Sequence, residues 1–470
     1  MSTGPLLALQ LEPGRPLGLQ LEAQLRTLIR SRRLPAGHEL PSTRVLAADL
    51  GVSRGVVVGA YAQLAAEGYV ALRRGAAPVV AALAGEEEQE WARTESDVPV
   101  AAARFNLRPD LPDLALFPRA QWLAACRASL HRAANTDLAY GDPFGAAELR
   151  SRLAVFLART RGVVATADRT GVQLGSTHVL FTLASALRAQ GAHRIGVEDP
   201  GHRWRTRALA ASGLEVVPVP VDREGLCVDA MPHVDAVVVS PDHHFPSGVA
   251  LSPERRRALV DWAVGGDRLV VEHDYDGHFR YDRPPAAALQ GVVPEHVAYV
   301  GGASALLAPT LRVGWAVLPT RLVVPFANET FGSVVSAPRL TQLALAELIA
   351  RGHLDRHLRR ARAAYRRRRE AMLAALERYL PGGVAGGAPV GLYLSLALPA
   401  ESDESEVLAA ARRRGLALDG VNEHALTAQP PGLVLGFAAS PEPTLRRALE
   451  LLGGGQTGRL RWQPAEDRLR

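Results

Sequence analysis

Every basic side chain of this sequence is an arginine, and this limits the covalent chemistry open to the chain. The 470 residues contain 54 Lys+Arg and 48 Asp+Glu, and no lysine occurs among them. A Schiff base with a carbonyl compound requires the ε-amine of a lysine, so no side chain of this sequence can form one. A coding bias toward Arg, Ala and Gly explains the composition, but the chemical consequence is the same whatever its cause.

A second chemical feature is a turn suited to anions. Gly175, Ser176 and Thr177 lie between a predicted strand and a predicted helix, where backbone N–H groups converge on a phosphate or similar group. Cys126 and Cys227, by contrast, are too few for a disulfide framework or a zinc site of their own. Their small number favours a cytoplasmic location.

The elements near the N-terminus place an arginine where DNA could be read. Ser42 is the N-cap of a predicted helix over 43–50, Gly51 ends that helix, and Ser53 caps a second helix that begins with Arg54. Two short helices joined by a tight turn form a helix-turn-helix. The first turn of the second helix has free N–H groups and the positive end of the helix dipole, which suit a phosphate or a base edge.

The flanking segments complete a winged form of this motif. A helix is predicted within 20–37, and two strand-like runs surround Arg73, Arg74 and Gly75 as a basic wing. Residues 1–80 carry nine Arg and five Asp+Glu, a net charge of +4. The alternative is a small helical domain with a solvated arginine face. The ordered succession of caps, turn, basic first turn and wing favours DNA binding.

The rest of the chain is predicted to form an acidic, Ala-rich linker over 81–105, an α/β domain over 106–455 and a tail over 456–470. Strand-like runs in the α/β domain are RIGVED (194–199), DAVVVSP (235–241), DRLVVEHD (267–274) and HVAYVGG (296–302). Because helical stretches separate these runs, we expect a mainly parallel sheet with helices on both faces. After a helix over 353–380, a smaller α+β segment has β-like runs at Gly391–Ala397 and Gly432–Ala438.

No membrane span or signal peptide is expected. The sequence has no apolar run of about 18 residues, and its first residues lack a basic region followed by a cleavage site. These observations also favour a cytoplasmic protein.

The first segment closely resembles the winged helix of GntR-type bacterial regulators. The matching stretches are LPSTRVLAADLGVSR (40–54), AYAQLAAEGYV (60–70) and RRG (73–75). The resemblance implies that Arg44 and Arg54 contact double-stranded operator DNA, with Ser53 on a phosphate and Arg73 and Arg74 at the wing. The family usually has Thr at the position of Val56, so a hydroxyl contact is lost there and base preference is expected to differ.

Residues 106–455 resemble the aminotransferase domain of fold-type I enzymes that bind pyridoxal phosphate. Stretches that carry this resemblance include YGDPFGAAELR (140–150), VEDPGHR (197–203), FPSGVALSPERRRAL (245–259), EHDYDGHFRYDRP (272–284) and GGASALLAPTLRVGW (301–315). A GntR-type winged helix joined to such a domain is typical of the MocR subfamily of regulators. The resemblance implies that Ser176, Thr177, Ser304 and Arg312 contact the phosphate.

The resemblance also implies that the rest of the cofactor pocket is degenerate. Ala305 stands where the family has its lysine, and His273 stands where an aspartate meets the pyridine nitrogen. Asp274 is adjacent, but neighbouring residues of a strand point to opposite faces. Tyr275, which meets the ring hydroxyl in the family, is kept. His202 replaces the stacking Tyr, and His244 replaces a Gln. Val434 replaces the arginine that binds the substrate carboxylate in aminotransferases.

His202, His244 and His273 are therefore expected in one pocket, and two interpretations stay open. They form a new ligand or metal site, or they are independent substitutions in which each ring is satisfied by backbone or water. Their spacing does not match a local metal motif, and we expect no metal. The arginines at 366–369 are expected on a solvated helix face.

Two functions from different classes follow. The first is a DNA-binding regulator whose large domain dimerises and binds an effector, with no covalent cofactor. In this first function, the ligand of the large domain's pocket is pyridoxal phosphate or another phosphate-bearing compound, bound without a covalent link, or the pocket has no such ligand. The second is a pyridoxal-phosphate aminotransferase with an accessory DNA-binding domain, which the missing lysine disfavours. The resemblance implies a homodimer in a head-to-tail arrangement, and the linker spans about 25–30 Å as a random coil.

Overall fold

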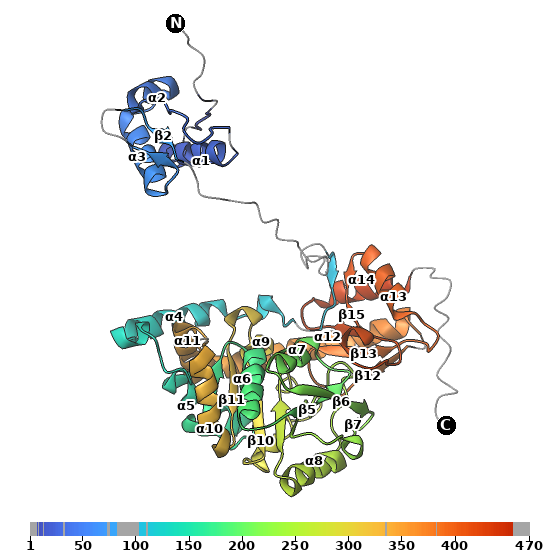
Figure 1. Ribbon diagram of the computed structural model, residues 1–470. Coiled ribbons are helices and arrows are strands. Elements are labelled where there is room, and N and C mark those ends of the chain that lie inside the picture. The colour runs from blue at the N-terminus through green and yellow to red at the C-terminus, as the bar shows by residue number, and fades with distance from the viewer. Residues whose placement is uncertain are drawn as a thin grey trace. The chain divides into compact units, whose positions relative to one another are not determined.

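The computed structural model describes Leu7 and residues 9–12, 14–31, 33–72, 76–81, 103–109, 111–333, 336–381 and 383–454. The chain divides into two compact units, Met1–Ser96 and Asp97–Arg470, which are described separately (Figure 1). Most of the predicted linker and the whole predicted tail lie outside the described residues. Phe105, at the end of the predicted linker, already belongs to a strand of the second unit, where it pairs with Leu416.

The first unit has three helices and a two-stranded hairpin among its described residues. These elements are α1 (Leu17–Arg30), α2 (Thr43–Leu50), α3 (Arg54–Ala66), β1 (Val70–Ala71) and β2 (Val79–Val80). Their core contains Leu21, Leu46, Tyr61 and Val80, all of which are buried. β1 and β2 pair antiparallel, so the hairpin that the sequence predicts is present, while its tip with Arg73 and Arg74 lies outside the described residues.

A large sheet organises the second unit. Its strand order is β4 (Thr170–Gln173), β11 (Gly314–Val317), β10 (Val297–Gly302), β9 (Leu269–His273), β8 (Ala236–Val239), β5 (Arg194–Asp199), β6 (Glu215–Asp222) and β7 (Gly225–Leu226). β10, β9, β8, β5 and β6 run parallel to one another, whereas β11 is antiparallel to β10 and β7 is antiparallel to β6. Because β4 is also antiparallel to β11, it runs in the direction of β10. The predicted α/β class is confirmed, with a mixed sheet.

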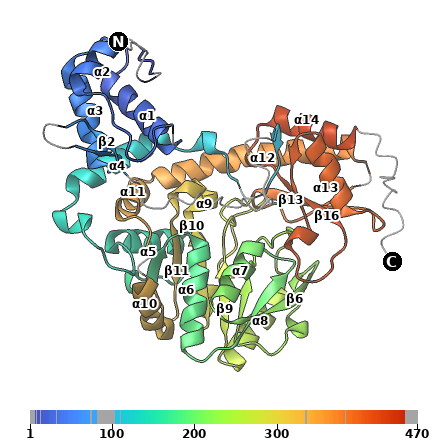
Figure 2. The same ribbon diagram turned by 45° about the horizontal axis from the view of Figure 1, so that its top comes forward.

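Helices cover both faces of this sheet, as Figure 2 shows. They include α6 (Ser176–Ala189), α7 (Arg203–Ala211), α8 (Pro253–Gly265) and α10 (Thr320–Ser333). Ala236 and Val238 of β8 pack in the apolar cluster that contains α6, α7 and α10. Val237 and Val239 point the other way and pack with α8. Both faces of β8 are therefore covered by helices, and this explains why its residues form an almost continuous apolar run.

Further helices complete the second unit. They are α4 (Arg119–Arg132), α5 (Ala147–Arg161), α9 (Ala303–Leu306), α11 (Arg339–Ala350), α12 (His353–Tyr379), α13 (Glu404–Arg413) and α14 (Glu442–Gly453). The smaller sheet is antiparallel, in the order β12 (Val384–Gly386), β13 (Tyr393–Ala397), β16 (Gly432–Gly436) and β15 (Asp419–Gly420), and β14 (Leu416–Ala417) pairs with β3 (Phe105–Asn106). α12 packs against α14 and connects the two sheets.

One expectation about α12 is wrong in part. Arg366 and Arg367 are exposed, but the side chain of Arg368 is only 12% exposed. Its guanidinium donates to Asp113 Oδ2 at 2.6 Å and also to the carbonyl of Ala438. This part of α12 therefore anchors the segment before α4 and the end of β16, which a pattern of consecutive arginines does not reveal.

Candidate DNA-binding surface and anion-binding pocket

The helix-turn-helix is capped as its sequence predicts at the first helix. Ser42 accepts a hydrogen bond from the N–H of Val45 at 3.3 Å, and Gly51 ends α2 in the left-handed conformation with φ of 66°. Ser53 is the N-cap residue of α3, but its hydroxyl makes no capping bond. This hydroxyl is exposed at the helix start, where an incoming phosphate oxygen would find it beside free N–H groups.

The arginines expected to read DNA are on the surface of the first unit. Arg44 and Arg54 are both exposed. Arg54 Nε donates to Thr43 Oγ1 at 3.3 Å, which ties the first residue of α3 to the first residue of α2. Behind them, Tyr61 Oη donates to the carbonyl of Pro41 at 2.9 Å and holds α3 against the segment before α2. The three exposed residues Arg44, Ser53 and Arg54 are thus presented by packed helices.

The pocket residues of the second unit come together at one edge of the large sheet. The carboxyl ends of β4, β5, β8, β9 and β10 lie at this edge because these strands run in one direction. Each strand is followed within five residues by a predicted pocket residue: Ser176 and Thr177, His202, His244, Tyr275 and Ser304 in that order. His273 is the last residue of β9. This is where open α/β sheets bind ligands.

The anion-binding turn lies at the start of α6. Gly175 has φ of 83°, which favours glycine, and α6 begins at Ser176. A Cβ atom on Gly175 would lie 3.8 Å from Arg312 Cζ, so the guanidinium is next to the turn. A Cβ atom on Gly302 would lie 3.7 Å from Ser176 Cβ, which places the end of β10 there as well. Arg312 is exposed, and its guanidinium has no hydrogen-bond acceptor among the described residues.

His202 and His273 face each other across an aromatic cluster. Their ring centroids are 6.5 Å apart, and the ring of Tyr275 lies 5.1 Å from His202 and 5.6 Å from His273. The ring of Trp204, which is 37% exposed, stands 5.0 Å from His202 and 5.8 Å from His273. His202 stacks on Phe245 at 3.8 Å.

The three histidines differ in how their ring nitrogens are satisfied. His244 has both partners, Ser247 Oγ at 2.6 Å and the carbonyl of Pro200 at 2.9 Å. His273 is buried, and neither of its ring nitrogens has a hydrogen-bond partner among the described residues; His202 Nε2 has none either. A buried polar atom without a partner costs about 1–3 kcal/mol. His244 thus fits a structural role, whereas His202 and His273 offer unused donors or acceptors.

All three rings are uncharged near neutral pH. Burial, reinforced by the positive charge of Arg205, lowers the pKa of His273 to about 3. The same two causes lower the pKa of His202 well below its ordinary value, and burial lowers that of His244. A neutral imidazole cannot supply the negative charge that stabilises a protonated pyridine nitrogen.

Tyr275 is placed by the strand end but its hydroxyl is already bonded. Tyr275 Oη lies 2.9 Å from the carbonyl of His243 and 2.8 Å from Tyr393 Oη. Burial raises the pKa of Tyr275 well above its ordinary value, so it stays protonated. Tyr393 donates in turn to the carbonyl of His244. These bonds fix the wall of the pocket.

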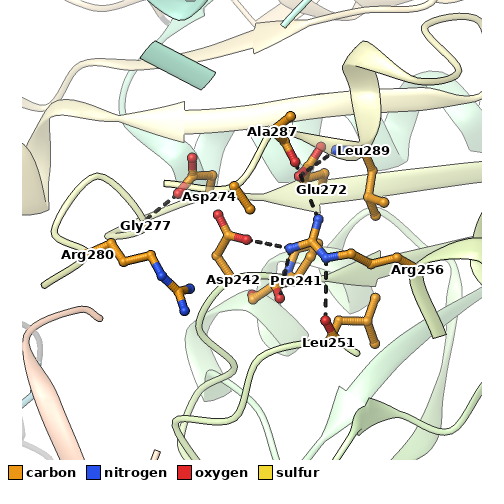
Figure 3. A network of polar contacts seen from close by, with 12 residues as sticks. Pro241, Asp242, Leu251, Arg256, Glu272, Asp274, Gly277, Arg280, Ala287 and Leu289 are labelled. Atoms are coloured by element: carbon orange, nitrogen blue, oxygen red, sulfur yellow. Dashed lines mark hydrogen bonds and ion pairs between the residues drawn. The ribbon is translucent and has the colours of Figure 1, made fainter. Parts of the chain in front are cut away.

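Asp274 lies on the opposite side of β9 from His273, as strand geometry predicts. It accepts from Arg161 Nε at 2.6 Å and from Tyr299 Oη at 2.6 Å. Burial alone would raise the pKa of Asp274, but the charge of Arg161 lowers it to about 2. Figure 3 shows Asp274 with Glu272 and Asp242 on this side of the sheet. Asp274 therefore does not face the aromatic cluster that contains His273.

Two arginines important to the site were not found by sequence reasoning. Arg205 is completely buried, contacts Glu198 and Ser240 at 3.4 Å, and leaves Nε and Nη2 without partners among the described residues. Arg161 is 2% exposed and bridges Asp242 and Asp274. The available signal was weak, because each is one arginine of many. Arg205 follows three residues after His202, so only the helical spacing of α7 pointed to it.

Some kinds of site are not found in the described part of the chain. No three His, Cys, Asp or Glu side chains there are placed to hold a metal ion. No helix of the described residues has the length and apolar content that a membrane crossing requires.

Pyridoxal phosphate fits this pocket only at its phosphate end. The turn at Gly175 and the guanidinium of Arg312 suit a phosphate, as do the hydroxyls of Ser176 and Thr177. Half-buried Ala305, in α9, offers no amine for the aldehyde, and His273 is neutral where an acid is needed. The residues present therefore do not fit covalent binding of this cofactor.

Comparison with protein families matches both parts of the chain. The model of bacterial regulatory proteins of the gntR family matches residues 17–80, and the model of aminotransferase class I and II matches residues 112–452.

Individual proteins resemble the chain over most of its length. An HTH-type pyridoxine biosynthesis transcriptional regulator of Corynebacterium glutamicum, PdxR, is 33% identical over 94% of this chain and 97% of its own length. A probable rhizopine catabolism regulatory protein of Rhizobium meliloti, MocR, is 27% identical over 95% of both chains. Among solved structures, an archaeal alanine:glyoxylate aminotransferase superposes with a TM-score of 0.70 and 23% identity over 74% of this chain and 90% of its own, which shows a shared fold.

Proposed function

Because the chain belongs to the family of regulators in which a GntR-type domain precedes an aminotransferase class I and II domain, we propose that it is a DNA-binding transcription regulator. The observation that carries this proposal is the exposed set Arg44, Ser53 and Arg54 at the start of α3 and α2. The relatives that match over the whole chain are named as transcriptional regulators, which supports it.

In this proposal α3 enters the major groove of an operator. Arg54 reads a base edge, Arg44 and the hydroxyl of Ser53 hold phosphates, and the wing arginines Arg73 and Arg74 add backbone contacts. The side chain of Arg54 makes one long bond to Thr43, so it can turn to DNA at little cost. Val56 is half-buried and carries no hydroxyl, which removes one polar contact near the helix start.

The second unit acts in this proposal without aminotransferase chemistry. The alternative, an enzyme with an accessory DNA-binding domain, needs an amine at position 305 and an acid at position 273. The chain has Ala305 and the neutral His273 there. What remains is a site for a phosphate-bearing effector, held at the turn by Ser176, Thr177 and Arg312, with Ser304 as the further contact that the family resemblance implies.

The second unit also forms the homodimer in this proposal. Large apolar side chains are exposed on and near α4, α5, α10 and α11, and they are Leu123, Leu130, Leu138, Tyr140, Val155, Phe331 and Leu340. Exposed apolar side chains that lie together mark interaction surfaces, which supports an interface on these helices. A two-fold dimer in the head-to-tail arrangement of the family would place one winged helix on each of the two half-sites of an operator.

A paired experiment tests the proposal. A duplex selected from random sequence by the full chain is titrated with wild type and with Arg54→Ala, and sedimentation is measured on the same samples. We expect saturable binding of a dimer to two half-sites and its loss in the variant. A monomer at micromolar concentration, or a selection that enriches no sequence, would refute dimeric operator recognition.

A further inference from the structure

A cavity of about 340 Å³ lies under the opposite side of the large sheet from His273. Its lining includes Asp242 after β8, Leu251 before α8 and Arg280 after β9, together with Arg256 of α8 and Arg283. Figure 3 shows Arg280 and Arg256 entering this region from opposite sides of Asp242. The volume is in the range of small-molecule sites. The cavity is separate from the turn at Gly175, whose residues do not line it.

Arg256 and Asp242 form the closed side of the cavity. Arg256 donates to Asp242 Oδ1 and, at longer distances, to the carbonyls of Pro241, Leu251 and Ala287. The other oxygen of Asp242 accepts from Arg161. Four of the five N–H donors of Arg256 are therefore used within the protein, and each oxygen of Asp242 already accepts a hydrogen bond from an arginine.

Arg280 and Arg283 form the open side, and both have unused donors. The side chain of Arg280 is only 6% exposed; it pairs with Asp282 through Nε at 2.9 Å and Nη2 at 3.4 Å, while Nη1 has no acceptor among the described residues. The side chain of Arg283 is 66% exposed, and its nearest carboxylate oxygen is 4.0 Å away on Asp282. A buried guanidinium with an unused N–H is an incomplete anion site.

The charges around the cavity leave room for one negative group. With the bridge from Asp242 through Arg161 to Asp274 included, four guanidiniums face three carboxylates: those of Arg161, Arg256, Arg280 and Arg283 against those of Asp242, Asp274 and Asp282. The excess is one positive charge, which a carboxylate balances and a doubly charged phosphate exceeds. The remaining lining is apolar and comes from Leu251 together with alanines and prolines on both rims.

We propose that this cavity binds a small monocarboxylate with a short aliphatic body. The carboxylate accepts hydrogen bonds from Arg280 Nη1 and from the guanidinium of Arg283, and the aliphatic body packs on Leu251 and the neighbouring apolar rim. The site does not depend on the proposed DNA-binding function, nor on the pocket that contains His273.

Calorimetric titration of the full chain with hexanoate tests this site, with hexanamide as the uncharged probe of equal size. For a ligand of this size we expect a dissociation constant of about 1 mM for hexanoate and binding at least about tenfold weaker for hexanamide. Arg283→Ala should weaken hexanoate binding by about fivefold, since it removes one charge-assisted bond from an exposed guanidinium. The matched control is Arg257→Ala, an arginine of α8 that is 73% exposed and does not line the cavity. It should change the affinity less than about twofold.

A cavity-filling variant separates the site from general charge effects. Ala250→Phe keeps every arginine and fills the apolar rim, so it should abolish hexanoate binding while the melting temperature stays near that of wild type. Retained binding in Ala250→Phe, equal weakening by Arg257→Ala, or no heat of binding with wild type would each overturn the proposal. Loss of hexanoate binding in Arg312→Ala would also overturn it, because that result assigns the ligand to the other pocket.

Discussion

Titration with pyridoxal phosphate tests the account of the pocket most directly. Contacts at the phosphate end come from one exposed guanidinium, worth about 1 kcal/mol, one helix start, about 0.3–1 kcal/mol, and two hydroxyls, about 0.5–1.5 kcal/mol each. The sum for Arg312, the turn at Gly175, Ser176 and Thr177 is about 2–5 kcal/mol, a dissociation constant of about 0.2 mM or weaker.

The assay combines calorimetry with borohydride reduction and intact mass measurement. We expect weak binding of pyridoxal phosphate and of inorganic phosphate, at least about tenfold weaker binding of pyridoxal without its phosphate, and no mass increase on any side chain. Arg312→Ala should abolish the phosphate-dependent binding. A stable adduct on a wild-type side chain, or equal binding of pyridoxal and pyridoxal phosphate, would refute the reasoning.

The absence of lysine makes a restored amine unusually informative. Ala305→Lys would carry the single ε-amine of the sequence, so a reduced adduct is located without background from other lysines. Because His273 is neutral and buried, we expect a weak Schiff base in this variant. Adding His273→Asp should strengthen it by about tenfold through a charge-assisted bond to the pyridine nitrogen. Tight binding by Ala305→Lys alone would show that the histidines do not matter.

Further predictions concern DNA reading, the buried ion cluster and acid stability. Arg54→Ala should weaken binding to a selected duplex by about 1–3 kcal/mol and relax specificity at one base position, whereas Arg73→Ala should weaken binding to all duplexes alike. Anisotropy titrations distinguish the two variants, and equal losses of affinity by Arg54→Ala for selected and random DNA would contradict base reading. Arg161→Met should lower the free energy of unfolding by about 3–5 kcal/mol, because two buried aspartates lose the guanidinium that bridges them. A urea titration that shows a loss of less than about 1 kcal/mol would argue against this. The pKa of His273 falls from 6.5 to about 3 on folding, because burial favours the neutral ring. The stability that depends on the neutral ring is therefore complete above pH 6.5 and is lost as pH falls toward 3. The free energy of unfolding of His273→Asn should depend less on pH in this range, and an unchanged slope would exclude the effect.

Local features of the fold could be predicted from sequence because their causes are local. Ser42 and Gly51 bound α2 through a cap and a left-handed residue, both of which are read from a few neighbouring positions. The runs that became β5 and β9 are apolar because both sheet faces are covered. The edge at which the pocket residues meet also follows, since parallel strands share the direction of their carboxyl ends.

The partners of buried charges could not be predicted, because they are distant in sequence. Arg161 and Asp274 are 113 residues apart, and nothing near either residue indicates that the other will face it. The same holds for His244, whose ring nitrogens are satisfied by Ser247 and by the carbonyl of Pro200, while His273 is left without partners. Pattern alone treated the histidines as equivalent, and only packing distinguishes a structural ring from an available one.

The distribution of unsatisfied groups indicates which part of an enzyme-like site has been kept. A structural relic would be expected to close its buried polar atoms, since each open one costs about 1–3 kcal/mol. His244 follows that expectation, but His202, His273 and Arg205 keep ring or guanidinium nitrogens without partners among the described residues. The lysine that covalent chemistry needs is absent, whereas nitrogen atoms that can bind a ligand have no partner among the described residues. This contrast favours a pocket that recognises a ligand without transforming it, which is the property an effector domain requires.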